Sequence, residues 1–265
     1  MSEEQSQPVR SMTTAARIQL SEAAHWYSVN GEPVYEVAKA DGKGMTPTTL
    51  RHARKMNLLP SVTTILRVLD KPALTAWKIE QAVLAVMTTP RQPSEPDDIF
   101  IERVLKTDKE HDKERDKAAQ LGTDIHAAIE AGLRGLPIPP HLTVYADPVV
   151  EAVGQLGAVL WSERVLVGAG FAGKSDCGIG TMKGNVIVDF KSTKTLPKEC
   201  YPEHRLQLAA YARPALATRA FNAYISTTEP GKIAVCEVEG LEAAYGAFEN
   251  LLEVWFWLNN YRPSL

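Results

Sequence analysis

The chain lacks any long apolar run. No segment approaches the roughly eighteen consecutive apolar residues of a membrane-spanning helix. The polar start, Met1 to Met12, has no apolar stretch of the kind that a secretory signal contains. We therefore expect a cytoplasmic protein without a membrane partner. Residues 1–20 carry no periodic apolar pattern, and we expect them to form a loose tail.

Cysteine is scarce as well. The three cysteines, Cys177, Cys200 and Cys236, stand far apart without a C-x-x-C pair. This spacing argues against a structural zinc site and against a disulfide framework, and a protein-held iron–sulfur cluster normally needs four cysteines. We expect all three to be free thiols, with Cys177 acting as a small apolar residue of a strand.

An excess of positive charge is also missing. Lys and Arg number 29 against 32 for Asp and Glu, so the formal net charge is −3. Domains that bind nucleic acid through overall charge are usually basic, so any contact with phosphates has to be local. A short basic cluster lies at 51–55, whereas the mixed charges of 106–117 are typical of a solvated helix face.

Ordinary shares of hydrophobic (45%) and charged (23%) residues indicate a globular chain. The N-terminal part, 21–108, predicts a hairpin around Asn30-Gly31, because both residues tolerate positive φ. It also predicts a pair of helices that begin at Ser61 and Pro72, followed by a proline-rich loop or lid over Thr88–Asp98. We expect this part to be the N-terminal extension of a single domain spanning 21–265.

The remainder, 109–265, alternates between helix and strand patterns. An apolar stripe predicts a helix over Lys109–Leu133, with His126 beside the stripe. Apolar runs predict an α/β (α+β) fold with a mixed central β-sheet flanked by helices. The expected strands are 163–167, 171–179, 186–190, 221–226 and 233–238, and the expected later helices are 202–214 and 241–261.

One glycine-rich stretch resembles a nucleotide-binding loop. Gly168 to Gly173 matches G-x-G-x-x-G, but strand signals follow it where a dinucleotide site needs a helix. We interpret these glycines as a hairpin turn with a close backbone approach, and we expect no nucleotide cofactor. The chain also has no Walker motif, so we expect no ATP-driven motor in it.

The most informative residues are Asp176, Asp189 and Lys191. Strand alternation places Asp189 and Lys191 on one face. A loop closed by Gly180 opposite Asn185 would place Asp176 across from Asp189, with Cβ atoms roughly 5 Å apart. A shift of one residue would remove this arrangement, so the inference depends on the register.

Two carboxylates this close repel each other unless a cation lies between them. Oxygen ligands suit Mg²⁺ or Mn²⁺, and such an ion can promote phosphodiester hydrolysis, with Lys191 orienting the attacking water. The alternative is that Asp189 and Lys191 form a solvated strand pair and that Asp176 is an unrelated turn residue. Asp189 ends a strongly apolar run, where a carboxylate needs a partner, and this favours a site.

Four ordered motifs carry a resemblance to a known family: Gly122-Thr-Asp-Ile-His126, Gly173-Lys-Ser-Asp176, Asp189-Phe-Lys191 and Gln207-Leu-Ala-Ala-Tyr211. This series resembles the RecB-like branch of the PD-(D/E)XK nucleases. Pro60-Ser-Val-Thr and Trp77-Lys78 are more loosely similar to the mitochondrial genome maintenance exonuclease group. The resemblance implies a restriction-endonuclease-like core with an N-terminal helical extension.

The resemblance also implies roles for single residues. Asp176 and Asp189 would bind the metal, the Phe190 carbonyl would add a ligand, and Lys191 would assist the nucleophilic water. His126 would complete the metal shell. Because an imidazole favours a softer ion than oxygen ligands do, Mn²⁺ is expected beside Mg²⁺.

Gln207 and Tyr211 lie four residues apart on one helix face, and the resemblance places them near the substrate backbone. Glu130, one turn beyond His126, is expected either to orient the imidazole or to be exposed. Glu163 is expected either to add a carboxylate to the site or to be an exposed acid at a strand end. Three further residues are possible contacts for phosphates or bases: Lys194, Tyr201 and Arg205.

We therefore expect a Mg²⁺- or Mn²⁺-dependent DNA exonuclease that acts on single-stranded ends in DNA repair, recombination or replication. A structure-selective endonuclease is the alternative, because the motifs do not distinguish cutting at ends from internal cutting. A second alternative is a non-catalytic DNA-binding module that assists recombination or repair proteins. The intact acidic pair and Lys191 argue against this last hypothesis.

Overall fold

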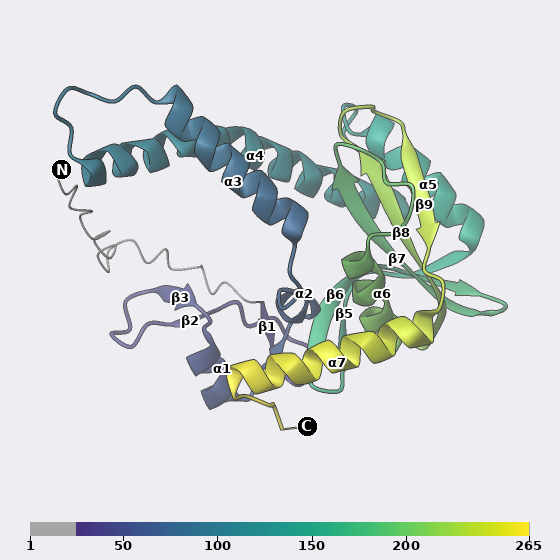
Figure 1. Ribbon diagram of the computed structural model, residues 1–265. Coiled ribbons are helices and arrows are strands. Elements are labelled where there is room, and N and C mark those ends of the chain that lie inside the picture. Colours follow the sequence, from purple (N-terminus) through teal and green to yellow (C-terminus); the bar gives the residue numbers. More distant parts are fainter. Residues whose placement is uncertain (1–24, 265) are drawn as a thin grey trace.

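The computed structural model describes residues 25–264, apart from the side chains of residues 73–74 and 106–116. The expected tail therefore lies outside the described part. The charged run from Lys106 is helical as expected, but most of its side chains lie outside the described part. A five-stranded mixed sheet of order β5-β6-β7-β8-β9 forms the centre, with β7 and β8 parallel and the other neighbours antiparallel (Figure 1). Its strands are β5 Ala158–Gly168, β6 Phe171–Thr181, β7 Gly184–Thr193, β8 Ala217–Ser226 and β9 Ile233–Glu237.

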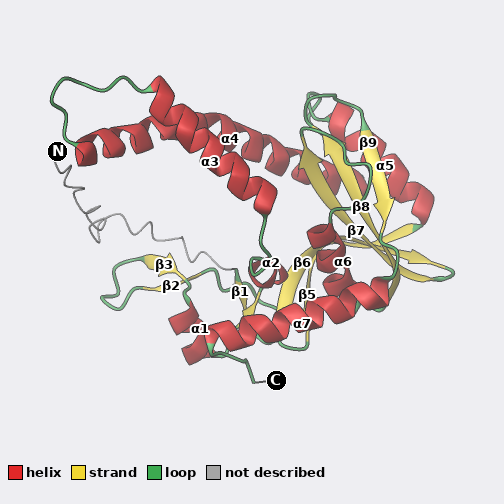
Figure 2. Cartoon of the chain, viewed as in Figure 1, coloured by secondary structure: helices red, strands yellow, loops and turns green. Residues whose placement is uncertain are grey.

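Helices cover both faces of this sheet (Figure 2). One face packs against α6 (Pro202–Ala212) and α7 (Leu241–Asn259), and the other against α4 (Asp97–Leu133) and α5 (Thr143–Leu156). Consecutive residues of β7 face opposite helix layers, because side chains alternate along a strand. Val188 packs in the cluster with α4 and α5, and Ile187 packs in the cluster with α6 and α7. The expected mixed α/β architecture is confirmed. None of the described helices has the length and apolar character needed to cross a membrane.

The N-terminal part packs against β6 and α6. Its turn at Asn30-Gly31 is confirmed, since Gly31 N–H donates to the Ser28 carbonyl at 2.9 Å with a φ of +84°. The two sides of the turn pair briefly, through an antiparallel bridge between Tyr27 and Pro33 and a Val34 N–H that donates to the Trp26 carbonyl at 2.8 Å. The strands also pair with other segments: β1 (Trp26–Tyr27) with β4 (Leu59–Pro60), and β2 (Glu36–Ala38) with β3 (Met45–Pro47). Ser61 begins α2 by accepting the Thr64 N–H, as expected. The helices of this part are α1 Leu50–Met56, α2 Val62–Leu66 and α3 Pro72–Thr88.

Besides α1, which was not expected, two helices differ from the expectation. α4 begins at Asp97, so α3 and the first part of α4 form a long pair that extends away from the sheet (Figure 1). α5 was not expected, because Pro148 interrupts an otherwise helical pattern, yet Ala146, Val149 and Val153 bury one face of it. The proline-rich loop is confirmed between residues 88 and 97. The glycine-rich stretch from Gly168 forms the expected turn between β5 and β6.

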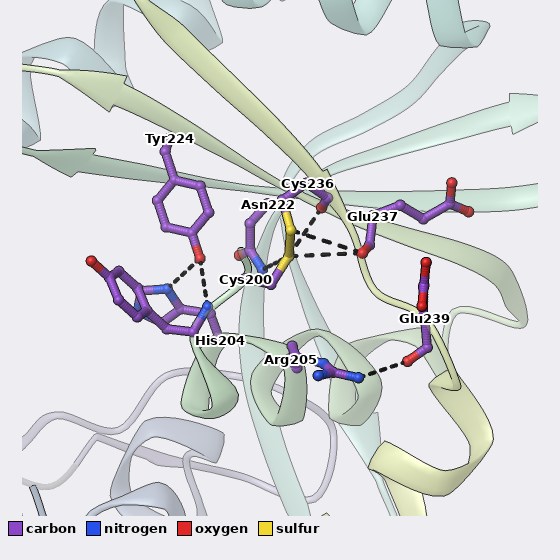
Figure 3. The surroundings of a disulfide bond; sticks show 9 residues. Cys200, His204, Arg205, Asn222, Tyr224, Cys236, Glu237 and Glu239 are labelled. Carbon is purple, nitrogen blue, oxygen red and sulfur yellow. Dashed lines mark hydrogen bonds between the residues drawn. A yellow bond between two sulfur atoms is a disulfide. The ribbon is translucent and has the colours of Figure 1, made fainter. Parts of the chain in front are cut away.

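The prediction that all three cysteines are free thiols is wrong for two of them. Cys200 and Cys236 form a disulfide with a Cα–Cα distance of 5.8 Å, and Cys177 alone is free and buried. Figure 3 shows the bond between β9 and the segment that leads into α6. The two residues are 36 positions apart, and only the β8–β9 pairing brings Cys236 beneath this segment. No spacing motif signals such a contact.

Candidate active site

The candidate site lies where β6 and β7 separate. Their paired residues run from Thr181↔Gly184 to Cys177↔Val188 and include Gly180↔Asn185, so the expected register is confirmed. The turn is tighter than the expected four-residue loop, because Thr181 and Gly184 already pair. Past Cys177, β6 continues beside β5 and β7 continues beside β8. We call this point the strand fork; Asp176 and Asp189 are the first residues of its two branches.

Asp176 bridges the fork with its side chain. Its Oδ2 accepts a hydrogen bond from the Phe190 N–H at 2.7 Å. In an extended strand the N–H and C=O of one residue lie along the same edge. The Phe190 carbonyl therefore faces the fork together with the Asp176 carboxylate, as a candidate ligand should.

A chain of polar contacts runs from Asp189 into α6. Lys191 Nζ lies 2.7 Å from Asp189 Oδ2 and donates to Gln207 Oε1 at 2.9 Å. Gln207 Nε2 donates in turn to Tyr211 Oη at 3.2 Å. Asp189, Gln207 and Tyr211 are buried. The structure thus brings the residues of the third and fourth motifs into one network.

The charges at the fork do not balance. Burial, and then the nearby Asp189 carboxylate, raise the pKa of Asp176 to about 8. Burial by itself would lower the pKa of Lys191, but Asp189 outweighs burial and raises it, so the ammonium stays charged. One lysine does not offset two carboxylates, of which Asp189 is buried and Asp176 is half-buried. The fork therefore favours an additional proton or cation beside Asp176.

His126 approaches the fork from α4. Its Nδ1 lies 3.8 Å from Asp176 Oδ2, and its ring meets the Phe190 ring edge-on with centroids 6.0 Å apart. Burial lowers the pKa of His126, so the imidazole is neutral at pH 7 and keeps a free electron pair. Gly122 lies one turn earlier on α4 and faces β7, where a Cβ would lie 2.6 Å from the rotatable Ser192 Oγ.

Gly173 allows a close approach on the other side of the fork. A Cβ at this position would lie 2.7 Å from Cε1 of the Tyr211 ring. The glycine therefore allows Tyr211 to reach β6 while its hydroxyl holds Gln207. Close packing around the site thus explains the motif glycine Gly173.

Glu163 and Glu130, each expected either at the site or exposed, lie in different surroundings in the structure. Glu163 lies between Ser162 and Arg164, whose partners on β6 flank Asp176, and its charge contributes to the raised pKa of Asp176. It forms an ion pair with Lys174 at 2.8 Å. Glu130 instead pairs with Arg134 on its own helix at 2.6 Å. Of the two, Glu163 is the one beside the fork.

Sequence reasoning missed His204. Its Nδ1 lies 3.0 Å from Tyr224 Oη, and Tyr224 pairs with Lys191 across the parallel β7–β8 ladder. Burial lowers the pKa of His204 to about 4. The available signal was helical spacing, because His204 precedes Gln207 by three residues and Tyr211 by seven, which places all three on one face of α6.

The donors at the fork suit a divalent cation that prefers oxygen. They are two carboxylates, the Phe190 carbonyl and a neutral imidazole. Among residues 25–264 as described, no three His, Cys, Asp or Glu side chains already stand close enough together to hold a metal. The fit therefore rests on the chemistry of the donors and on the uncompensated charge at Asp176, and His126 would have to move closer.

Comparisons with known proteins add little. No protein-family model matches the chain, and no characterised protein matches it significantly. One solved structure, the crystal structure of SSO0001, is 18% identical over 35% of this chain and 48% of its own length, with a TM-score of 0.26. The chain thus spans about half the length of that structure, and so partial a likeness carries no argument about function.

Proposed function

We propose that this protein is a Mg²⁺- or Mn²⁺-dependent nuclease of the RecB-like branch of the PD-(D/E)XK superfamily. The observation that carries the proposal is the strand fork, where Asp176, Asp189 and Lys191 converge and Gln207 holds the lysine. A carboxylate pair with a fixed cation beside it suits phosphoryl transfer, which relies on positioning and on charge stabilisation. The mixed sheet with helices on both faces is compatible with such a core.

The fork residues divide the work between holding a metal and handling the substrate. Asp176, Asp189 and the Phe190 carbonyl would hold the ion, with His126 completing the set. When bound, a divalent ion polarises a phosphoryl oxygen and lowers the pKa of a bound water. Asp176 favours cation binding, because burial beside Asp189 makes its lone negative charge costly.

Lys191 acts as a charged donor in this proposal. Its ammonium has three hydrogens, and the contacts to Asp189 and Gln207 engage two of them. The third remains for the attacking water or for a phosphate oxygen. Since the raised pKa keeps Lys191 protonated, it orients water and stabilises developing negative charge and does not remove a proton.

We further propose DNA as the substrate and cleavage from single-stranded ends, in DNA repair, recombination or replication. The support is the motif resemblance, together with the ion pair between Lys71 at the start of α3 and Glu203 at the start of α6, with a 3.4 Å Nζ–Oε1 distance. This pair places the N-terminal helices beside the helix that carries Gln207. A DNA strand that enters the fork would therefore pass close to α3.

A cleavage assay tests the proposal. End-labelled linear and circular single strands are incubated with Mg²⁺ or Mn²⁺ and the wild type, Asp189→Asn or Lys191→Ala. We expect metal-dependent cleavage of linear strands by the wild type alone. Cut circles would show an endonuclease. Binding of DNA without any cleavage would favour a non-catalytic module. Cleavage by both variants at the rate of the wild type would overturn the proposed site.

A further inference from the structure

Two aromatic residues at the start of α6 have no role in the proposed metal binding or cleavage. Tyr201 is the N-cap of α6, and His204 lies in its first turn. Their ring centroids are 5.5 Å apart, and both rings meet the buried ring of Tyr224. Tyr201 is 43% exposed, so one side of its ring faces solvent. An exposed aromatic ring held by a buried tyrosine and a half-buried histidine is a suitable platform for stacking.

The hydroxyl of Tyr224 orients His204. It accepts the backbone N–H of Tyr201 at 3.3 Å and lies 3.0 Å from His204 Nδ1 (Figure 3). With one proton accepted, the phenol can donate its own hydrogen to Nδ1. The neutral imidazole then carries its proton on Nε2. His204 thus presents an N–H donor on the side of the ring that faces away from Tyr224.

This pair lies close to the reacting centre. Tyr224 is the ladder partner of Lys191 on the neighbouring parallel strand, so both side chains project from the same face of the sheet. Gln207, which holds Lys191, follows His204 by one helical turn. A single strand of DNA whose phosphate reaches Lys191 would therefore bring its adjacent nucleotide to Tyr201 and His204.

The nearby charges permit a phosphate there. Glu203 is the closest acid in the first turn of α6, and it forms an ion pair with Lys71. The Lys191 ammonium and the Asp189 carboxylate, which form an ion pair, act on the pKa of His204 in opposite directions. The negative charge of Glu203 is thus offset by Lys71, which lies at the start of α3.

We propose that Tyr201 and His204 form a binding site for one nucleotide of a single strand, next to the phosphate that is cleaved. The Tyr201 ring stacks on the base, and the His204 Nε2–H donates to the phosphate of that nucleotide. Tyr224 is a positioning residue that holds the imidazole. This inference rests on the proposed nuclease function and assigns the recognition of a neighbouring nucleotide to residues outside the four motifs.

Kinetics on an oligonucleotide series test this site. One abasic nucleotide is moved along a single strand, and kcat and KM are measured for the wild type, Tyr201→Ala and Tyr201→Phe. We expect Tyr201→Ala to raise KM by about tenfold on the intact strand, in line with the stacking of one base. Tyr201→Phe should behave as the wild type. On the strand whose abasic position meets the platform, the two Tyr201 variants should no longer differ.

His204 is tested on the intact strand. His204→Ala should lower kcat/KM by about tenfold, since a hydrogen bond to a charged phosphate is lost. His204→Gln, which keeps an N–H donor, should recover most of this loss. The inference is overturned if neither alanine variant changes kcat/KM, or if Tyr201→Ala has the same effect on every abasic strand, as a purely structural role would.

The two levels of the proposal fail in different ways. A wild type that cleaves no DNA with either metal refutes the nuclease function, and this binding site with it. A wild type that cleaves normally while the Tyr201 and His204 variants cleave equally well refutes only the binding site.

Discussion

The strand fork and the helical arm, which we define as α3 with residues 97–120 of α4, follow opposite rules of burial. At the fork, polar side chains are inside: Asp189 is 2% exposed and Gln207 is 7% exposed. On the arm, large apolar side chains are outside, with Ile79 at 60% and Met87 at 77%. Burying polar groups costs free energy unless they are paired, and exposed apolar groups contribute little to stability.

The difference shows what each region contributes. The fork is a strained electrostatic arrangement within a well-packed sheet, because burial and Asp189 both disfavour the ionised form of Asp176. Such perturbed carboxylates cluster at functional sites. The arm lacks a comparable cluster among its described side chains. We therefore expect substitutions at the fork to act on activity, and substitutions on the arm to act weakly on both activity and folding.

The largest expected effect is on cleavage. Asp189→Asn should reduce kcat by about 10³-fold or more, since the loss of a ligand carboxylate removes several kcal/mol of transition-state stabilisation. On the arm, Met87→Ala should leave kcat within about twofold of the wild type. Single-turnover cleavage of an end-labelled strand measures both. An arm variant as inactive as the fork variant would break the comparison.

The second largest expected effect is on stability, where alanine variants of a core and an arm isoleucine should differ. Ile187 is fully buried between the sheet and α6, whereas Ile79 is exposed on α3. Ile187→Ala should lower the free energy of unfolding by about 2–5 kcal/mol, and Ile79→Ala should change it by less than about 0.5 kcal/mol. Urea unfolding followed by circular dichroism gives both values. Equal losses would mean that the arm is packed in solution.

Two glycines sharpen the comparison within the site. Gly173→Ala should cost about 1–3 kcal/mol, because the new Cβ would lie 2.7 Å from the buried Tyr211 ring. Gly122→Ala should be close to neutral, since Ser192 Oγ can rotate away and alanine favours the helix. Thermal unfolding of the two variants measures this contrast. A larger loss for Gly122→Ala would contradict the packing described for the fork.

The pH dependence of metal stabilisation should give the smallest effect. The folded-state pKa of Asp176 is raised to about 8 from 3.8. Its contribution to stability is therefore present below pH 4 and is lost as the pH rises through 8 in metal-free protein. Mg²⁺ should offset this loss, so it should raise the melting temperature more at pH 8 than at pH 5.5. Asp176→Asn should remove the difference, and a pH-independent gain would contradict the assignment.

Local patterns predicted much of this molecule. Strand alternation and the pairing of Gly180 with Asn185 predicted the register that places Asp176 opposite Asp189. This was possible because a β-hairpin is formed by residues close in sequence. Helix and strand periodicity likewise predicted most elements of the sheet layers. The helix α5 was not predicted. Its Pro148 disfavours a helix, but the burial of three apolar residues on one face stabilises it.

Contacts between distant segments were not predictable in the same way. The Cys200–Cys236 disulfide depends on the placement of β9 beside β8, and the His204–Tyr224 contact depends on how α6 lies over the parallel strands. The partners of β1 also come from a distant segment, β4. Such pairings follow from tertiary packing, which a single sequence does not display.

The central claim is that the fork binds a divalent cation and uses it to cleave DNA. The most direct measurement is a Mn²⁺ titration in which bound metal, read by electron paramagnetic resonance, and cleavage of an end-labelled single strand are followed in the same samples. We predict that both rise together in the wild type and that both are lost in Asp176→Asn and Asp189→Asn. Cleavage in the presence of a chelator, or unchanged Mn²⁺ binding in both variants, would contradict the account.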